Sequence, residues 1–490
     1  AQLWLAAPLV VVFAYAANVP IFPNDLFWSL ASGKVMFEAG PWPWREALTY
    51  APRNEPTINQ PWLAHLAFHA TFDIGGYPLL LLLHGGAITI SFALIAAACW
   101  NALKHPRIVA FLTVGAFLLA ATNLNVRTQT FGVLCFALFL AALRAGYGEP
   151  RWLLALPLIM AGWVNVHGSF VLGLALLVVE WGAAALSRAL PLKGQIDAPN
   201  PLPLRRLAMT TALVVAATLA NPVGPLILRY VTQVVGSSVI QRFTFEWQPP
   251  NLLHEGDYLF WASLVIVAVV LALRRERASW REVLLAAVFI ALGLRARRNI
   301  IWWGLVMAPI LATVLRDLRP PRQLLGRHAM GSVVAAFFAL VALLSLPWAR
   351  LVLPLRFDGH GPFLDGKTPV AATDFLATHL EGQRIFTNME WGGYVAWVLW
   401  PRARVFVDAR LETYTVEAWE DYLRIMDGAP AWEQLLEQYR PDYLLIDQDN
   451  ARLVEQVRAS PRWRLLYEDD VGVVFQRDAA PREARGASLP

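Results

Sequence analysis

Long apolar runs are the feature of this sequence that most limits its fold. About eleven occur before residue 350, and several are long enough to cross a ~30 Å hydrocarbon core at ~1.5 Å per residue. We therefore expect an α-helical polytopic membrane protein with about eleven transmembrane helices. The runs cover 2–20, 78–101, 108–122, 131–143, 152–166, 168–187, 207–221, 258–273, 281–296, 299–315 and 330–348.

Composition agrees with a membrane protein, since 57% of residues are hydrophobic and 16% are charged. A soluble globular protein has roughly 45–50% apolar and ~25% charged residues. The net charge of +5 comes mostly from arginines in short loops. This charge therefore indicates topology and an anionic ligand rather than binding to nucleic acid.

Basic residues alternate between successive loops, as the positive-inside rule requires. The pattern places the N-terminus in the cytoplasm, and it places loops 21–77 and 222–257 and everything after about residue 350 outside. An odd number of spans, such as eleven, fits this topology. The basic loops contain Lys104 and Arg107; Arg144 and Arg151; Arg188, Lys193, Arg205 and Arg206; Arg274, Arg275, Arg277 and Arg281; and Arg316, Arg319, Arg322 and Arg327.

The first outer loop is too long for a plain connector. Helical spacing of apolar residues predicts two amphipathic helices on the outer membrane surface, at 24–39 and 62–73. The Pro- and Trp-rich stretch 40–44 between them must be irregular, and 224–236 is a candidate for a third interfacial helix.

The last 130 residues alternate short helices with β-strands, which predicts a small extracytoplasmic α/β domain. We thus expect two domains, a transmembrane domain at 1–350 and an α/β domain at 351–490. The expected strands are 384–388, 404–408, 443–447, 463–467 and 471–476, with helices at 417–426, 431–439 and 451–459, and a turn followed by a short helix at 391–394.

Two acidic residues of the first outer loop are candidates for catalysis. Asp25 lies one turn beyond the first apolar run, where a carboxylate is costly unless it is used. Asn24 or Asp25 could instead cap the following helix, and the two roles are compatible. A transferase that moves a sugar onto a hydroxyl needs a carboxylate to accept the proton. Glu46 is the second candidate, with a structural role as its alternative.

Several charged groups lie at the outer ends of predicted spans, where the topology rule disfavours basic residues. Such cations either reach the lipid headgroups or hold an anion, for example a lipid-linked phosphate. Glu246, in the second outer loop, or Asp25 could also be their counter-ion. The candidate substrate-binding residues are Arg127, His167, Glu246, Arg297 and Arg298. We expect no metal site, since His65 and His69 lack a third convergent ligand, and no cofactor.

Several segments resemble a family of bacterial membrane proteins described as GT-C-like glycosyltransferases, akin to protein mannosyltransferase and aminoarabinose transferase. The resemblance covers nearly the whole chain. It rests on Asp25–Gly33, Pro43, Leu48–Tyr50, Asn59–Leu63, Trp163–Gly168, Asn221–Gly224, Glu246–Trp247, Arg298, Trp391–Tyr394, Val405–Arg410 and Tyr467–Asp470.

The resemblance implies a catalytic or acceptor-orienting role for Asp25 and a polyprenyl-phosphate sugar as the donor. One departure concerns a second carboxylate. Relatives often carry Asp where this chain has Glu46, and His-Glu-Trp-Leu where it has Gln60–Leu63. Metal-assisted or paired-acid chemistry is therefore not expected.

These observations predict a glycosyltransferase of a bacterial inner membrane. It would transfer a sugar from a polyprenyl-phosphate donor to an extracytoplasmic glycan, lipid or protein, with Asp25 as general base. Its other partners would be membrane lipids, with no nucleic acid. The alternative is a non-catalytic membrane subunit that docks through its α/β domain. A transporter is less favoured, because no inverted repeat is visible and Glu180 is the one candidate ionisable residue within a span.

Overall fold

The computed structural model describes residues 2–40, 46–54, 57–190, 201–236, 240–241, 244–318, 328–353 and 361–478. Residues 41–44 of the irregular stretch expected at 40–44 lie outside these ranges. So do four of the basic loop residues, Lys193, Arg319, Arg322 and Arg327.

The chain divides into two compact units. The first contains residues 1–19, 78–231 and 241–354, and the second contains residues 20–77, 232–240 and 355–490. The first outer loop thus belongs to the second unit, whereas the sequence pattern assigned it to the helical domain.

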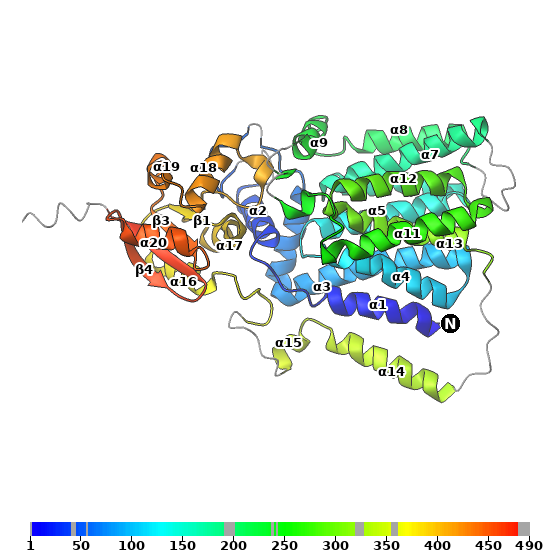
Figure 1. Ribbon diagram of the computed structural model, residues 1–490, viewed down its shortest axis with the longest axis horizontal. Coiled ribbons are helices and arrows are strands. Elements are labelled where there is room, and N and C mark those ends of the chain that lie inside the picture. Colours follow the sequence, from blue (N-terminus) through cyan, green and yellow to red (C-terminus); the bar gives the residue numbers. More distant parts are fainter. Residues whose placement is uncertain are drawn as a thin grey trace, which may run out of the picture. The chain divides into compact units, whose positions relative to one another are not determined.

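Each of the eleven predicted apolar runs coincides with a helix. Their labels follow Figure 1. The helices are α1 (Gln2–Ala16), α3 (Trp62–Leu103), α4 (Pro106–Ala121), α5 (Gln129–Ala145), α6 (Ala155–Trp163), α7 (Val171–Ala189), α8 (Leu204–Ala217), α11 (Tyr258–Leu273), α12 (Trp280–Arg295), α13 (Ile300–Val314) and α14 (His328–Leu344), with α9 (Leu226–Gly236) and α15 (Ala349–Val352) in addition.

Among the described residues, three helices are long and apolar enough to cross a membrane by themselves: Trp62–Leu103, Gly168–Ala189 and Glu255–Leu273. The others are shorter, so the number of eleven spans stays a prediction. The fold class is confirmed at the level of a mostly helical protein with a small C-terminal sheet.

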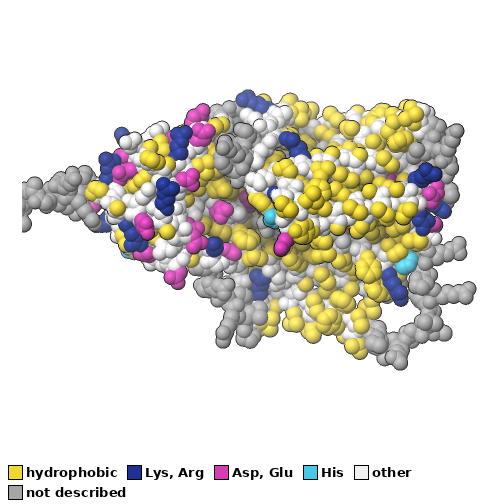
Figure 2. Space-filling model, viewed as in Figure 1, with side chains coloured by type: hydrophobic (Ala, Val, Ile, Leu, Met, Phe, Trp, Pro, Cys, Tyr) yellow, Lys and Arg dark blue, Asp and Glu magenta, His cyan; other side chains and the backbone are white. Residues whose placement is uncertain are grey.

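Helix α13 forms the centre of the first unit, and all of its residues from Ile300 to Val314 are buried. A helix that is apolar all round is expected in such a position. By contrast, α11 and α14 expose large apolar side chains, among them Val265, Leu273 and Phe337. Figure 2 shows apolar side chains over much of the visible face of these helices. An exposed apolar surface of this kind suits contact with lipid.

Helix α3 is broken at Gly75 and Gly76, whose backbone torsions are not helical. Gly76 has a φ of 59°, in the left-handed region that glycine adopts without a steric cost. The segment 62–73, predicted as a separate helix, is therefore the part of α3 before this break. The boundary between the two units follows directly, between Tyr77 and Pro78.

The second unit is built on a five-stranded sheet in the order β2-β1-β3-β5-β4. Strands β2, β1 and β3 are parallel, and β5 and β4 are antiparallel to their neighbours. The predicted strands are confirmed, although β2 is shorter than expected. The strands are β1 (Arg384–Thr387), β2 (Arg404–Val405), β3 (Tyr443–Asp447), β4 (Trp463–Glu468) and β5 (Gly472–Arg477).

The helices of this unit are α2 (Asp25–Ala39), α16 (Val370–His379), α17 (Met389–Leu399), α18 (Val416–Met426), α19 (Trp432–Tyr439) and α20 (Ala451–Ala459). The three helices predicted around the strands at 417–426, 431–439 and 451–459 are confirmed. The turn predicted at 391–394 is wrong, because these residues lie inside α17.

Side chains alternate between the two faces of the sheet, as strand geometry requires. Ile385 belongs to a core that includes residues of α2, α16 and α17. Its neighbour Phe386 packs instead against Tyr422 of α18, with ring centroids 5.8 Å apart. The sheet thus has helices on both faces.

The first outer loop extends this sheet at its β2 edge. The backbone N–H of Tyr50 donates to the carbonyl of Val405 over 3.0 Å, and the N–H of Val405 donates to Leu48 over 3.0 Å. Thr49 lies parallel to Val405 as an isolated bridge. Leu48 also enters the core beneath the sheet, together with Ala31 and Val35 of α2. The loop is therefore an integral part of the α/β unit.

Candidate functional site

Asp25 is the first residue of α2, and the cap is formed by the residue before it. The Asn24 side-chain oxygen accepts a hydrogen bond of 2.7 Å from the backbone N–H of Asp25. The backbone carbonyl of Asp25 accepts one of 2.8 Å from the Ser29 hydroxyl. The sequence left the cap between Asn24 and Asp25, and the structure assigns it to Asn24.

Helix α17 fixes the position of this helix start. A Cβ added to Gly393 would lie 2.8 Å from the carbonyl oxygen of Asn24 and 2.9 Å from the nitrogen of Trp28. Phe27 packs edge-on against Tyr394, with centroids 4.9 Å apart. Only a glycine allows the two backbones to approach this closely.

Glu412 shares the surroundings of Asp25. Burial raises the pKa of the Glu412 carboxyl, and the charges of Asp408 and Asp25 raise it further. This effect places a second acidic group within electrostatic reach of the Asp25 carboxylate, inside the second unit.

Glu46 is held by a buried network with Arg410. Arg410 donates to the two Glu46 carboxylate oxygens over 2.7 and 3.2 Å, and the Glu46 side chain is only 1% exposed. The same carboxylate accepts from the backbone N–H groups of Leu48 and Thr49. Burial alone would raise the pKa of Glu46, but the Arg410 charge and these hydrogen bonds lower it below its ordinary value.

Arg410 is shared with a second carboxylate. It donates to Asp408 over 2.6 and 2.9 Å, and the Tyr414 hydroxyl donates to Asp408 over 2.7 Å. The guanidinium also lies over the ring of Trp28 at 5.3 Å from its centroid. The network therefore connects the first outer loop and α2 to the segment after β2.

His65 packs beside this network, with its ring edge-on to Trp28 at 4.6 Å. Its two ring nitrogens and the Trp28 indole nitrogen are buried and have no hydrogen-bond partner among the described residues. Among all the residues that the structure describes, no group of three or more His, Cys, Asp or Glu residues could hold a metal ion.

In the first unit, Arg127 and Arg298 meet at Glu246. Arg127 donates to the Glu246 carboxylate over 2.8 Å, and Arg298 lies 3.4 Å from its other oxygen. Arg127 also donates to Asn123, while Arg298 stacks over Trp247 at 4.4 Å. Burial opposes ionisation of Glu246, yet the two arginines lower its pKa to about 2. One carboxylate thus pairs with two arginines in this cluster.

His167 belongs to the same cluster electrostatically. Its Nδ1 accepts from the backbone N–H of Ser169 over 3.1 Å and lies 2.7 Å from the Ser169 hydroxyl. Burial and the positive charges of Arg298 and Arg127 lower its pKa to about 3. The imidazole is therefore neutral at physiological pH and adds no positive charge.

Arg297 is directed to a different acid. It pairs with Asp257 over 2.9 Å and stacks on Phe245 at 4.2 Å. Adjacent residues of the short 3₁₀ turn Arg297–Asn299 point in different directions. The three candidate arginines thus divide between two acids, with Arg127 and Arg298 at Glu246 and Arg297 at Asp257.

Glu180, the one acidic residue noted within a span, is also paired. It accepts a hydrogen bond of 2.6 Å from Arg281 of α12 and another from the Tyr147 hydroxyl. Its carboxylate therefore joins α7 to α12 as part of the packing of the first unit.

Sequence reasoning missed Arg410, Asp408 and Asp257 as partners of the candidate residues. The stretch Val405–Arg410 was noted only as part of the family resemblance. The Glu46–Arg410 pair could not be predicted from spacing, since the two residues are 364 positions apart.

No protein-family model and no curated protein sequence matches this chain. Solved structures do match. ArnT from Cupriavidus metallidurans in the apo state is 15% identical, with 98% of each chain covered and a TM-score of 0.56. Arabinofuranosyltransferase AftD from Mycobacteria is 16% identical over 98% of this chain and 40% of its own length, with a TM-score of 0.54.

The apo oligosaccharyltransferase of Archaeoglobus fulgidus is a third match. It is 12% identical over 97% of this chain and 74% of its own, with a TM-score of 0.52. These three proteins are GT-C glycosyltransferases, and this chain shares their fold. At such low identity the likeness establishes the fold, and the activity has to be argued from the residues.

Proposed function

We propose that this protein is a membrane glycosyltransferase that takes a sugar from a polyprenyl phosphate and gives it to an extracytoplasmic acceptor. The observation that carries the proposal is the match to ArnT over 98% of both chains. Since the match includes the outer loop and the α/β unit as well as the helices, it extends to the part of the chain where Asp25 lies.

Asp25 is the proposed general base. Because Asn24 caps α2, the Asp25 carboxylate is not needed for that purpose. In the reaction, the acceptor hydroxyl oxygen forms a bond to the anomeric carbon while the bond from that carbon to the phosphate oxygen breaks. The hydroxyl proton goes to Asp25, and the lipid phosphate leaves with its negative charge, so no general acid is needed.

Arg127 and Arg298 are the proposed phosphate-binding residues. The two guanidinium groups meet at Glu246, and a guanidinium can bind two phosphate oxygens at once. His167 would contribute a neutral hydrogen-bonding group. Arg297 is neutralised by Asp257, so we assign it to the packing of the outer loop rather than to the donor.

Glu46 is proposed as a positioning residue. Both of its oxygens are occupied by Arg410 and by backbone N–H groups, so a role in proton transfer would first require this network to open. Its contribution would be to hold the first outer loop on the sheet, and with it the helix that begins at Asp25.

The positive-inside pattern supports a bacterial inner-membrane location with the N-terminus in the cytoplasm and the α/β unit outside. This orientation would place the proposed polyprenyl-phosphate donor in the outer leaflet and the proposed glycan, lipid or protein acceptor outside the cytoplasm.

The test is a transfer assay with the purified protein in lipid nanodiscs. A panel of polyprenyl-phosphate hexoses and pentoses is supplied with an envelope extract as the source of acceptors, and released polyprenyl phosphate is measured by mass spectrometry. Release by the wild-type protein and not by the Asp25→Asn variant is expected. Equal background release by both proteins across the panel would overturn the proposal and favour the non-catalytic subunit.

A further inference from the structure

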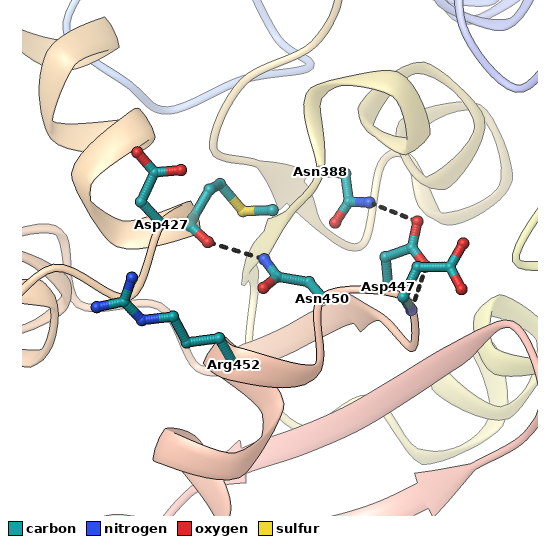
Figure 3. Close-up of a pocket in the computed structure, with 7 residues that line it drawn as sticks. Asn388, Asp427, Asp447, Asn450 and Arg452 are labelled. Carbon is teal, nitrogen blue, oxygen red and sulfur yellow. Dashed lines mark hydrogen bonds between the residues drawn. The ribbon is translucent and has the colours of Figure 1, made fainter.

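The α/β unit contains a cavity of about 610 Å³ that the proposed reaction does not use. Ligand pockets typically measure ~300–1,000 Å³. The cavity is lined by residues from three parts of the unit (Figure 3). They are Asn388 after β1, Met426 and Asp427 at the end of α18, and Asp447, Asp449, Asn450 and Arg452 at the end of β3 and the start of α20.

The cavity lies where the topology of the sheet changes direction. From β1 the chain passes to β2 on one side, and it then returns to β3 on the other side of β1. In open α/β sheets, ligands bind in the crevice at the carboxyl ends of the strands at such a point. Asn388 and Asp447 lie at the carboxyl ends of β1 and β3, the two strands that meet there.

Some of the lining groups are already used within the protein. The Asn450 side chain donates to the carbonyl of Met426 over 2.8 Å, and Asp447 accepts from the backbone N–H of Asp449. Asn388 donates to Asp447 over 3.3 Å. These bonds hold the walls in place.

One other lining group has an unused hydrogen-bonding capacity within the part of the chain that the structure describes. The Asn388 side-chain oxygen is buried and accepts no hydrogen bond from the described residues. In Figure 3 this oxygen points away from Asp447, and the Arg452 side chain extends toward Asp427 from the opposite wall. A buried acceptor without a donor is unfavourable, so a ligand that supplies a donor is favoured.

We propose that this cavity is a saccharide-binding site, separate from the transfer reaction, that holds a sugar unit of a glycan. Vicinal sugar hydroxyls both donate and accept hydrogen bonds. Asp427 and the Asn388 oxygen would accept from them, and the Arg452 guanidinium would donate to them. This inference rests on the proposed function, since the bound sugar unit would belong to the glycan that accepts the transferred sugar.

The charges and geometry of the cavity argue against other ligands. Three aspartates line it, against Arg452 and the Lys367 that pairs with Asp449, so one net negative charge remains to repel a phosphate or another anion. A metal ion needs several convergent ligands, and the described residues contain no group of three or more His, Cys, Asp or Glu residues with that geometry. A neutral polyhydroxy ligand fits both observations.

The experiment measures sugar binding without catalysis. Full-length protein in nanodiscs is mixed with D-mannose, D-galactose, D-glucosamine and their β-linked disaccharides, and saturation-transfer-difference NMR detects the bound sugar. We expect binding of at least one probe, weakened roughly tenfold in Asp427→Asn and in Arg452→Gln, a change of about 1.4 kcal/mol. Glu455→Gln is the matched control, since Glu455 lies exposed on α20 and does not line the cavity.

The outcomes separate this inference from the proposed reaction. Asp25→Asn should abolish transfer and leave sugar binding unchanged, so that either idea can fail alone. The saccharide site is wrong if none of the probes binds, if the Asp427 and Arg452 variants bind as wild type does, or if those variants change only the binding of Ca²⁺ added alone.

Discussion

Glu46 and Arg410 form a buried ion pair with a distance of 2.7 Å, although 364 positions separate them in the chain. The pair joins the first outer loop to the segment that follows β2. Both side chains are at most 7% exposed, so the pair is shielded from water, and Arg410 also bonds to Asp408.

Replacement Glu46→Gln should therefore destabilise the second unit. Removing one partner of a buried pair costs about 3–5 kcal/mol when the other charge is left unpaired. The cost here should be smaller, because Arg410 keeps its bonds to Asp408. Thermal unfolding and protease sensitivity of the first outer loop would measure the effect. The control is Lys367→Gln, which breaks the exposed Lys367–Asp449 pair and should leave unfolding unchanged. Equal behaviour of the two variants would contradict a buried structural pair.

Replacement Asp25→Asn should reduce transfer by roughly 10²–10⁴-fold with normal folding, because a positioned general base contributes that much. Asn24→Ala is the control, since loss of the cap costs about 1 kcal/mol of stability and leaves the base in place. Turnover and thermal unfolding are measured on both variants. Near-normal turnover of the Asp25→Asn variant would limit Asp25 to a structural role.

The Glu246 cluster should be sensitive to acid. The folded pKa of about 2 lies below the ordinary value of 4.5. The ionised Glu246 carboxylate therefore stabilises the folded protein fully above pH 4.5, and this contribution to stability is lost as the pH falls toward 2. Wild type should unfold at a higher temperature than Glu246→Gln at pH 7, and the difference should shrink as the pH falls below about 4.5. A difference that is constant with pH would show that the carboxylate charge contributes nothing.

Gly393→Ala should disturb the start of α2. The added Cβ would lie within 3 Å of two backbone atoms, at Asn24 and Trp28, and backbone cannot move aside as a flexible side chain can. We expect lower stability and lower transfer together. Gly86→Ala is the matched control, because nothing lies within 4 Å of its added Cβ and alanine favours a helix by roughly 0.5–1 kcal/mol. A Gly393 variant as stable and active as the Gly86 variant would disprove the close packing.

The topology can be tested by labelling cysteines in intact cells. Both test positions, Arg151 and Asp449, have exposed side chains. An impermeant maleimide should label Asp449→Cys and not Arg151→Cys, since the positive-inside pattern places residue 151 in the cytoplasm. The opposite result would invert the proposed topology.

Much of the fold could be predicted because its determinants are local. Apolar runs predicted eleven of the helices, and short β-branched segments between polar turns predicted the five strands. The turn expected at Trp391 was wrong because tertiary packing overrode the helix-breaking tendency of two glycines. Gly392 would place a Cβ 2.2 Å from the carbonyl oxygen of Val407, so small residues are required there within a helix.

The candidate site was less predictable, because its partners are distant in sequence. The three arginines all lie at the outer ends of predicted spans, but this position does not tell which acid each arginine pairs with. Arg298 pairs with Glu246 and its neighbour Arg297 with Asp257, a division that depends on how one short turn is oriented. The extension of the sheet by Leu48 and Thr49 was likewise not predictable from local sequence, because it depends on contact with the distant residue Val405.

That extension of the sheet has a consequence for biosynthesis. Thr49 emerges from the ribosome long before its partner Val405, and the Glu46–Arg410 pair spans 364 residues. At a translation rate of ~5–20 residues per second, roughly 20–70 s pass between the synthesis of the first outer loop and the synthesis of the strand that pairs with it. During this time its backbone donors and acceptors have no sheet partner. A chain that stalls before residue 405 therefore leaves an unfinished edge for the quality-control proteases.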